Sequence, residues 1–413
     1  MSKSMIRTMV VTAILAAGGF SATAALAQQV SKESAKTLKA AQDAAAAKQY
    51  PQVISSAQET LANPKKTKDD TYVAYSMLAH AYFATNNMPE LLKALQGQID
   101  SGFPGADVNK ITQTQTQVAF QAKLYDQAVQ YGQRLITSGA ASPDVYTTVG
   151  QSYFQQQKYS DAAKFFSGLV SSAEKAGRKP DDQHLKLLLT SYDKAGNKEA
   201  SNEALEKLVK YYPTANTWNA LLFPLKTEKQ EPRQKLHVYR LMQDTGNLKQ
   251  APDYSSYSEV ATAVGLPAEA YNVLDAAIKA NAFTQDTEKQ RAERYLASAK
   301  TRTDTAKAEM PKREAEAKAA PTGDLDVSYG MALFSFGDYP KAIEALKRGI
   351  TKGSLRNPAD AQLTLGIAQL RSSQKSDALA TFKGIQSTDA VTTRIAELWE
   401  LYASGSSTSV AQR

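Results

Sequence analysis

Two pairs of small residues repeat at the same interval near the end of the chain. Gly330 and Gly366 are 36 residues apart, and Ala342 and Ala378 are separated by the same 36 residues. Two landmarks that share one spacing indicate a duplicated structural unit, and repeats of about 20–50 residues are typical of solenoids and related arrays. A single unit of this size cannot bury its apolar face alone, so several units must stack in a row.

An earlier stretch, residues 143–170, shows the internal pattern of one unit. Tyr146, Gly150 and Tyr153 recur at helical spacing on a first helix. After a polar turn, Ala162 and Phe166 lie four apart and mark the face of a second helix. The stretch resembles one tetratricopeptide repeat (TPR) unit, in which two antiparallel helices pack through a small residue.

The same pattern returns along most of residues 31–386. It recurs in residues 31–59, 72–102, 143–170, 182–213 and 251–278, with a weaker copy in residues 109–135, and it is most regular in the two late units that contain Gly330 and Gly366. The unit around Trp218 is irregular because Pro224 and Pro232 interrupt it. A low content of Pro (15) and Gly (21) also favours an all-α chain. The resemblance therefore implies a TPR-like α-solenoid, a superhelix of antiparallel helix pairs.

The N-terminus has the order of a secretory signal peptide. Lys3 and Arg7 precede a short apolar run, and small residues follow up to Ala27. We expect cleavage after Ala27 and export of a mature chain that starts at Gln28. The apolar run is short for a membrane span, and no later stretch has the roughly 20 apolar residues that a span needs. The expected location is periplasmic or secreted.

Five segments are expected in order along the chain. They are a signal peptide (1–27), an N-terminal TPR-like array (28–283), a charged segment (284–322), a C-terminal TPR pair with a capping helix (323–403) and a disordered tail (404–413). The charged segment has few large apolar residues, so it is either a degenerate repeat with a solvated hinge helix or a partner-binding arm. A terminal capping helix is what an array of this kind needs to shield its last unit.

Composition and motifs give little support to catalysis. The chain has no cysteine, and its three histidines do not have metal-ligand spacing. We find no phosphate-binding Gly-rich loop, HExxH motif or nucleophile elbow. We therefore expect no enzyme activity, no cofactor and no metal. The net charge of +8 is a mild excess over 413 residues, which disfavours nucleic acid as a partner.

The resemblance implies a binding groove lined by the first helix of each unit. The residues at the corresponding positions are His80, Phe83, Gln113, Gln117, Phe120, Gln121, Thr147, Gln151, Phe154, Gln155, Lys186 and Lys194. Phenylalanine offers apolar area and glutamine offers both donors and acceptors, which suits an extended peptide. The row of Phe83, Phe120 and Phe154 either faces the groove or packs between units, and both interpretations stay open.

Three functions remain at this point. The first is an exported TPR scaffold that binds protein or extended peptide segments in the cell envelope, for assembly, secretion or wall-related work. The second is a module that binds glycans, cell-wall material or anionic lipid, which the Tyr-rich helices and mild basic excess suggest. An unrecognised envelope hydrolase is the third, because catalytic triads are spatial and leave no sequence run.

Overall fold

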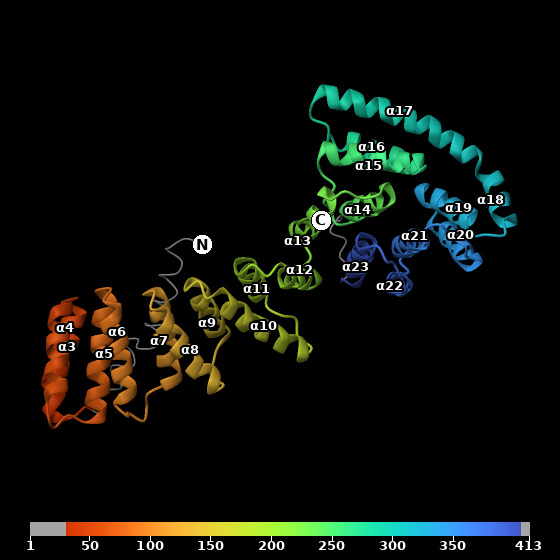
Figure 1. The fold of residues 1–413 in the computed structure, drawn as a ribbon. Coiled ribbons are helices and arrows are strands. Elements are labelled where there is room, and N and C mark those ends of the chain that lie inside the picture. Colours follow the sequence, from red (N-terminus) through yellow and green to blue (C-terminus); the bar gives the residue numbers. More distant parts are fainter. Residues whose placement is uncertain (1–29, 406–413) are drawn as a thin grey trace. The chain divides into compact units, whose positions relative to one another are not determined.

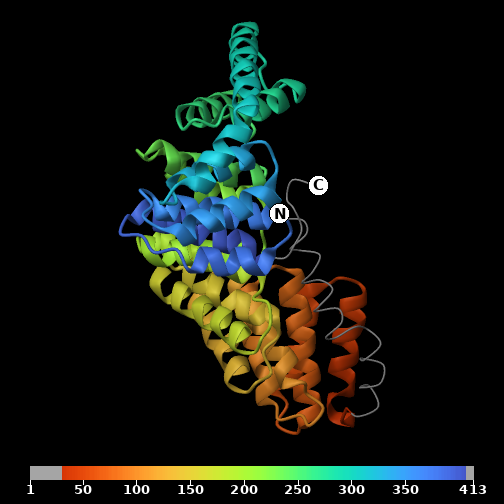
Figure 2. The same cartoon turned by 90° about the vertical axis from the view of Figure 1, so that its right-hand side faces the viewer.

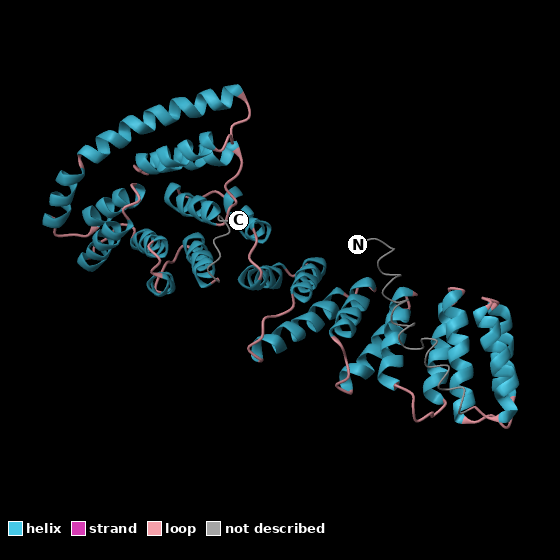
Figure 3. Ribbon diagram, turned by 180° about the vertical axis from the view of Figure 1, so that it is seen from behind, coloured by secondary structure: helices cyan, strands magenta, loops and turns pink. Residues whose placement is uncertain are grey.

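The computed structural model describes residues 30–405, and every regular element in that range is an α-helix (Figure 1). The helices, drawn in cyan in Figure 3, follow one another as pairs joined by short loops. The all-α, TPR-like prediction is thus confirmed. The predicted signal peptide and nearly all of the predicted tail lie outside the described residues.

The chain divides into two compact units, one up to Lys198 and one from Glu199. The division falls within the range that the sequence assigned to a single N-terminal array. We describe each unit separately as unit 1 and unit 2.

Unit 1 is a regular succession of helix pairs. Its helices are α3 (Lys32–Ala46), α4 (Tyr50–Ala62), α5 (Lys68–Ala84), α6 (Met88–Asp100), α7 (Val108–Gln121), α8 (Tyr125–Thr137), α9 (Pro143–Gln155), α10 (Tyr159–Lys175) and α11 (Asp182–Ala195). Each helix contacts the next one along the chain, as expected for a stack of antiparallel pairs.

The turn inside each pair has a repeated backbone conformation. Lys48, Lys123 and Gln157 occupy the same place in three of these turns, and they have positive φ angles of 58°, 61° and 60°. Two residues later, the second helix begins at Tyr50, Tyr125 and Tyr159 respectively. The left-handed residue reverses the chain in a three-residue turn, which brings the two helices of a pair together.

Small residues let the paired helices approach closely, as the sequence predicted. A Cβ atom placed on Gly150 would collide with the ring of Phe166, and one placed on Gly366 would collide with the ring of Phe382. In both pairs the glycine lies in the first helix and the aromatic residue lies in the second. Each aromatic side chain therefore fills the space that the glycine leaves.

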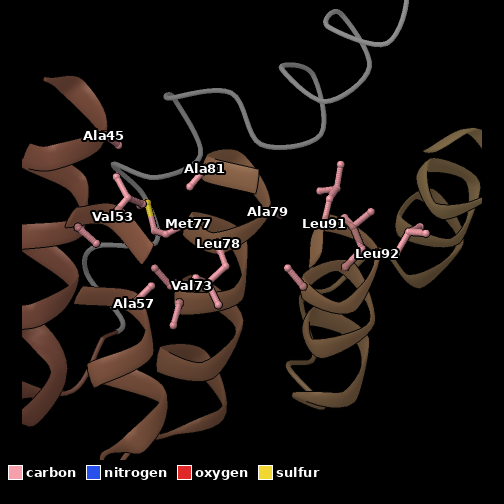
Figure 4. Packing of buried hydrophobic residues seen from close by; sticks show 14 of the residues in the cluster. Ala45, Val53, Ala57, Val73, Met77, Leu78, Ala79, Ala81, Leu91 and Leu92 are labelled. Carbon is pink, nitrogen blue, oxygen red and sulfur yellow. The ribbon is translucent and has the colours of Figure 1, made fainter. Parts of the chain in front are cut away.

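The core of unit 1 is built from small and medium aliphatic side chains. Figure 4 shows Val53 and Ala57 of α4 beside Val73 and Met77 of α5. Leu91 of α6 continues the same cluster. Such a core grows by adding pairs, because each helix pair presents one apolar face to the next.

Unit 2 begins with the same architecture and then departs from it. Its helices are α12 (Lys198–Tyr211), α13 (Ala215–Thr227), α14 (Pro232–Asp244), α15 (Ala251–Ala263), α16 (Pro267–Lys279), α17 (Asp286–Ala308), α18 (Met310–Ala319), α19 (Asp324–Ser335), α20 (Tyr339–Lys352), α21 (Pro358–Arg371), α22 (Lys375–Lys383) and α23 (Ala390–Ser404). Helix α14 contacts α21 and α23, and α16 contacts α19. Unit 2 is therefore closed on itself by contacts between its early helices, α14 to α16, and its late helices, α19 to α23. We call these contacts the closure.

The charged segment 284–322 forms α17 and α18. Figure 2 shows α17 as a long helix at the edge of unit 2, where it packs on α16. Only Ala292 and Ala299 of α17 are buried, and i,i+4 ion pairs such as Lys300–Asp304 support its exposed length. Whether this segment acts as a hinge or a binding arm stays a prediction.

The last helix, α23, does more than cover the final repeat. Trp399 is fully buried and its indole N–H donates to the carbonyl oxygen of His237 in α14 at 3.3 Å. The Tyr402 hydroxyl donates to the carbonyl oxygen of Asp244 at 3.1 Å.

Among residues 30–405, no helix is long and apolar enough to cross a membrane.

Candidate functional site

The predicted groove residues lie on α5, α7, α9 and α11. Helix α7 contacts α9, and α9 contacts α11. The predicted residues of these three helices therefore lie on neighbouring first helices, and we call the surface that they mark the first-helix face. His80 and Phe83 lie on α5, which packs on α3, α4 and α6.

Two of the predicted side chains link neighbouring units. The Gln113 amide donates to the Ser142 hydroxyl at 3.2 Å, just before α9 begins. The Thr147 hydroxyl is 3.0 Å from Nε2 of His184 in α11. These hydrogen bonds tie the first helices together, so Gln113 and Thr147 shape the face.

The Phe row lies at the turns of its own units. Phe120 meets Tyr125 edge-on with ring centroids 5.7 Å apart, and Phe154 meets Tyr159 edge-on at 5.1 Å. Phe83 is half-buried against the core of unit 1. All three rings keep part of their surface exposed, but each already has a packing partner. A role for them in binding stays a prediction.

Four glutamines on the face have no hydrogen-bond partner among the described residues. Gln117 and Gln121 lie on α7, and Gln151 and Gln155 occupy equivalent places 34 residues later on α9. Gln121 and Gln155 are exposed, whereas Gln117 and Gln151 are half-buried. Two neighbouring helices thus present the same pair of uncommitted amides, each with donor and acceptor capacity.

The basic end of the face is partly neutralised. Lys186 forms an ion pair with Asp182 one turn earlier in α11. Lys194 lies exposed in the last turn of the same helix. The first-helix face is therefore mainly neutral and rich in amides.

A buried charged cluster in unit 2 was not predicted from the sequence. Arg240 of α14 donates through Nε and Nη2 to the two carboxylate oxygens of Glu269 in α16, both at 2.7 Å. The Tyr257 hydroxyl of α15 donates to the same carboxylate at 2.8 Å. Side-chain exposure is 1% for Arg240 and 7% for Glu269, so this two-pronged pair lies inside the unit.

His237 extends the cluster to the other side of the closure. Its Nε2 is 2.8 Å from Oδ1 of Asp360 in α21, and its Nδ1 is 3.4 Å from Nη1 of Arg240. Arg233 donates to the other oxygen of Asp360 at 2.8 Å. The geometry fits a neutral imidazole that donates to Asp360 and accepts from Arg240. Both ring nitrogens are committed, so His237 cannot serve as the base of a catalytic triad in this arrangement.

Aromatic rings complete the surroundings of the cluster. The guanidinium carbons of Arg240 and Arg371 lie 4.4 and 5.2 Å from the ring centroid of Phe334. Arg371 also donates to Asp244 of α14 at 3.0 Å. Two arginines from opposite sides of the closure thus share one ring, with a carboxylate partner for each.

The electrostatics of the cluster favour this one set of protonation states. Burial alone would raise the pKa of Glu269, but the charge and hydrogen bonds of Arg240 outweigh it and lower the pKa. Burial lowers the pKa of His237, even though its bond to Asp360 opposes the change. Burial would likewise raise the pKa of Asp360, yet His237 and Arg233 hold it below its usual value. His237 is therefore neutral and both carboxylates are charged near pH 7.

An open cleft lies at the outer end of this closure. Its volume is about 860 Å³, and its walls come from the first turn of α14, the end of α15, the start of α21 and the loop before α23. Arg233, His237 and Asp360 form part of its wall, so the cleft opens directly onto the charged cluster. Clefts of about 300–1,000 Å³ are typical of ligand sites.

One sequence signal for the cluster is visible in retrospect. Arg233, His237 and Arg240 lie four and three residues apart, on one face of a helix in which residues 236–242 are all buried. Charged and polar side chains inside a fully buried stretch of helix indicate partners in the interior. Those partners could not be located from the sequence, since Asp360 follows His237 by 123 residues.

Comparisons with known proteins find resemblance in structure alone. No protein family and no curated protein match the chain. Similar solved structures include the TPR2AB domain–pHSP90 complex of yeast Sti1, with 13% identity over 73% of this chain and 99% of that one and a TM-score of 0.25. The Naa15/Naa10 complex with HypK has 14% identity over 90% and 62%, with a TM-score of 0.33. A tetratricopeptide repeat protein from Parabacteroides merdae has 11% identity over 80% and 98%, with a TM-score of 0.20.

Proposed function

We propose that the chain is an exported TPR-type scaffold that binds segments of partner proteins on the first-helix face of unit 1. The observation that supports this most is the repeated pair of uncommitted glutamines on α7 and α9. These four amides recur in equivalent places on two neighbouring first helices, and none is committed to a hydrogen bond within the described residues. An extended peptide that crosses the face would supply carbonyl oxygens and N–H groups to them.

The proposed place of action is the cell envelope, in an assembly, secretion or wall-related complex. It rests on the order of basic, apolar and small residues that precedes Gln28. Fractionation of cells and N-terminal sequencing of the mature protein test this part. Export predicts a mature N-terminus at Gln28 in the periplasmic or secreted fraction, and a full-length cytosolic protein would contradict it.

The binding proposal is tested by cross-linking and affinity purification from envelope extracts. The test variant replaces Gln117, Gln121, Gln151 and Gln155 by alanine, which removes no hydrogen bond of the described structure. The control replaces Gln127 and Gln130 of α8, which are exposed glutamines of the same array outside the first-helix face.

The expected result is that the test variant loses partner proteins that the wild-type and control chains retain. We prefer this variant to replacement of the Phe row, because those rings have packing partners and their loss would also lower stability. Equal recovery by the test and control variants would remove the support for the first-helix face.

A further inference from the structure

The cleft of unit 2 has walls from both sides of the closure. One side is the start of α14 with Ala263 and Val264 at the end of α15, and the other is the start of α21 with residues 386–389 and Thr392. These two sides are joined by polar contacts. The Gln234 amide donates to Asp389 at 2.7 Å and to the Thr392 hydroxyl at 3.1 Å. An occupant of the cleft would therefore touch both sides at once.

Several polar groups of the cleft have unused hydrogen-bonding capacity. Among the described residues, the side chains of Asn357, Gln386 and Thr388 have no hydrogen-bond partner. The Arg233 guanidinium uses Nη1 on Asp360 and on the sulfur of Met331, which leaves its other N–H groups uncommitted. The cleft thus offers donors and acceptors in one place.

The remaining wall is aliphatic, and the charges nearly balance. Val264, Pro358 and Leu363 contribute apolar surface, and no Phe, Tyr or Trp lines the cleft. Arg356 donates to Asp324 at 2.8 Å, and Arg233 is paired with Asp360. Glu231 and Asp389 also line the cleft, and the carboxylate of Asp389 accepts from the Gln234 amide and from the Thr392 N–H. An anionic ligand would find both arginines already paired, and a sugar ring would find no Phe, Tyr or Trp to stack on.

We propose that this cleft is a second binding site, which takes a short uncharged peptide segment with aliphatic side chains, and that its occupant stabilises the contacts between α14 and α21. The choice of a peptide rests on the proposed function, whereas the location rests on unit 2 alone. Amides and hydroxyls bind the main chain of the segment, and the aliphatic wall receives its side chains. A ligand that contacts both sides binds the folded unit and not the unfolded chain, so it stabilises the contacts between these two sides.

The test uses the full mature chain and a pool of end-blocked octapeptides built from Ala, Val, Leu, Ser, Thr, Asn and Gln. The tightest binder is then measured by calorimetry on the wild type and on the variant Asn357→Ala with Gln386→Ala. The matched control is Gln285→Ala with Gln290→Ala, two exposed amides of the same unit outside the cleft. Hydrogen exchange of α14 and α21 reports closure.

We expect the cleft variant to bind at least tenfold more weakly, and the control to bind as the wild type does. The bound peptide should slow amide exchange in the first turns of α14 and α21. Absence of any binder, equal binding by the cleft variant, or preference for a pool with Asp, Glu, Lys or Arg would overturn the site. Binding without slower exchange would overturn the coupling to closure.

The glutamine variant of unit 1 separates this proposal from the proposed function. It should keep the octapeptide affinity of the cleft while losing partner proteins on the first-helix face. Loss of octapeptide binding in that variant alone would assign the peptide to unit 1, and the cleft proposal would fail.

Discussion

Units 1 and 2 are built from similar helix pairs but are held together differently. Within residues 30–405, unit 1 buries one acidic or basic side chain, Asp70, whereas unit 2 buries His237, Arg240, Asp253, Glu269 and Asp326. Contacts in unit 1 run mainly between helices that are near in sequence, and in unit 2 they also join α14 to α21 and α23. An apolar stack can be extended one pair at a time, but a charged closure fixes one arrangement of distant helices. The comparison predicts that the two units respond differently to the same kinds of change.

The largest expected effect comes from breaking the buried pair of unit 2. Glu269→Gln leaves the Arg240 guanidinium buried without a counter-charge, and loss of one partner of a buried pair costs about 3–5 kcal/mol. We expect a lower denaturant midpoint for unit 2 and an unchanged one for unit 1, measured by hydrogen exchange resolved along the chain. As a surface control, Asp275→Asn, which removes an exposed pair with Lys279, should leave both units unchanged.

A double replacement sharpens the same test. Arg240→Met with Glu269→Leu removes both charges, so most of the lost stability should return. A double variant as unstable as the single one would show that the pair does more than balance its own charges. Equal destabilisation of unit 1 by Glu269→Gln would contradict the division into two units.

Mild acid should weaken unit 2 through His237 and Asp360. Both have lowered pKa values in the folded chain, so unfolding takes up protons and their contribution is lost as the pH falls. The His237 contribution is present above the unfolded pKa of about 6.5, and that of Asp360 is present above about 3.9. Each falls as the pH drops below these values towards the folded pKa.

Denaturant midpoints of unit 2 between pH 7 and pH 5 measure the His237 part of this effect, because the Asp360 part is lost only at lower pH. The expected loss approaches about 1.4 kcal/mol for each pH unit in which the unfolded chain binds one more proton. His237→Gln should flatten the profile in this range. A profile that keeps the wild-type slope in this variant would exclude His237 as its source.

Replacing glycine by alanine should change the free energy of unfolding in opposite directions at two positions of one helix pair. Gly150→Ala places a methyl group against the buried Phe166 ring, and overpacking of this kind costs about 1–3 kcal/mol. Gly168→Ala in α10 meets open space, so it should gain about 0.5–1 kcal/mol from helix propensity. Thermal unfolding of unit 1 measures both changes, and a gain at Gly150 would contradict the close approach of α9 and α10.

The repeated fold was predictable because its signals are local. Gly330, Gly366 and the aromatic residues that follow them mark helix pairs within about 36 residues, a range in which sequence spacing determines the packing. The closure of unit 2 was not predictable, since His237 and Asp360 belong to different pairs and neither has a motif. The division at Lys198 was missed for the same reason: α12 continues the local pattern and gives no sign of a boundary.

The candidate site also has a part that the sequence could predict and a part that it could not. Position counting placed Gln117, Gln121, Gln151 and Gln155 on consecutive first helices, where the structure also has them. Counting could not show that Gln113 and Thr147 bond to the next unit, because those partners depend on how units stack. The unit 2 cleft could not be predicted from the sequence, because its walls come from four segments that are far apart along the chain.

The distance between α14 and α23 tests the charged closure most directly. The chain has no cysteine, so Gln243→Cys and Glu397→Cys introduce two unique spin-label positions, one on an exposed part of each helix. At pH 7 we predict one narrow distance distribution, which broadens when Glu269→Gln is added. A broad distribution in the parent chain, or a narrow one that Glu269→Gln leaves unchanged, would contradict a unit held closed by its buried charges.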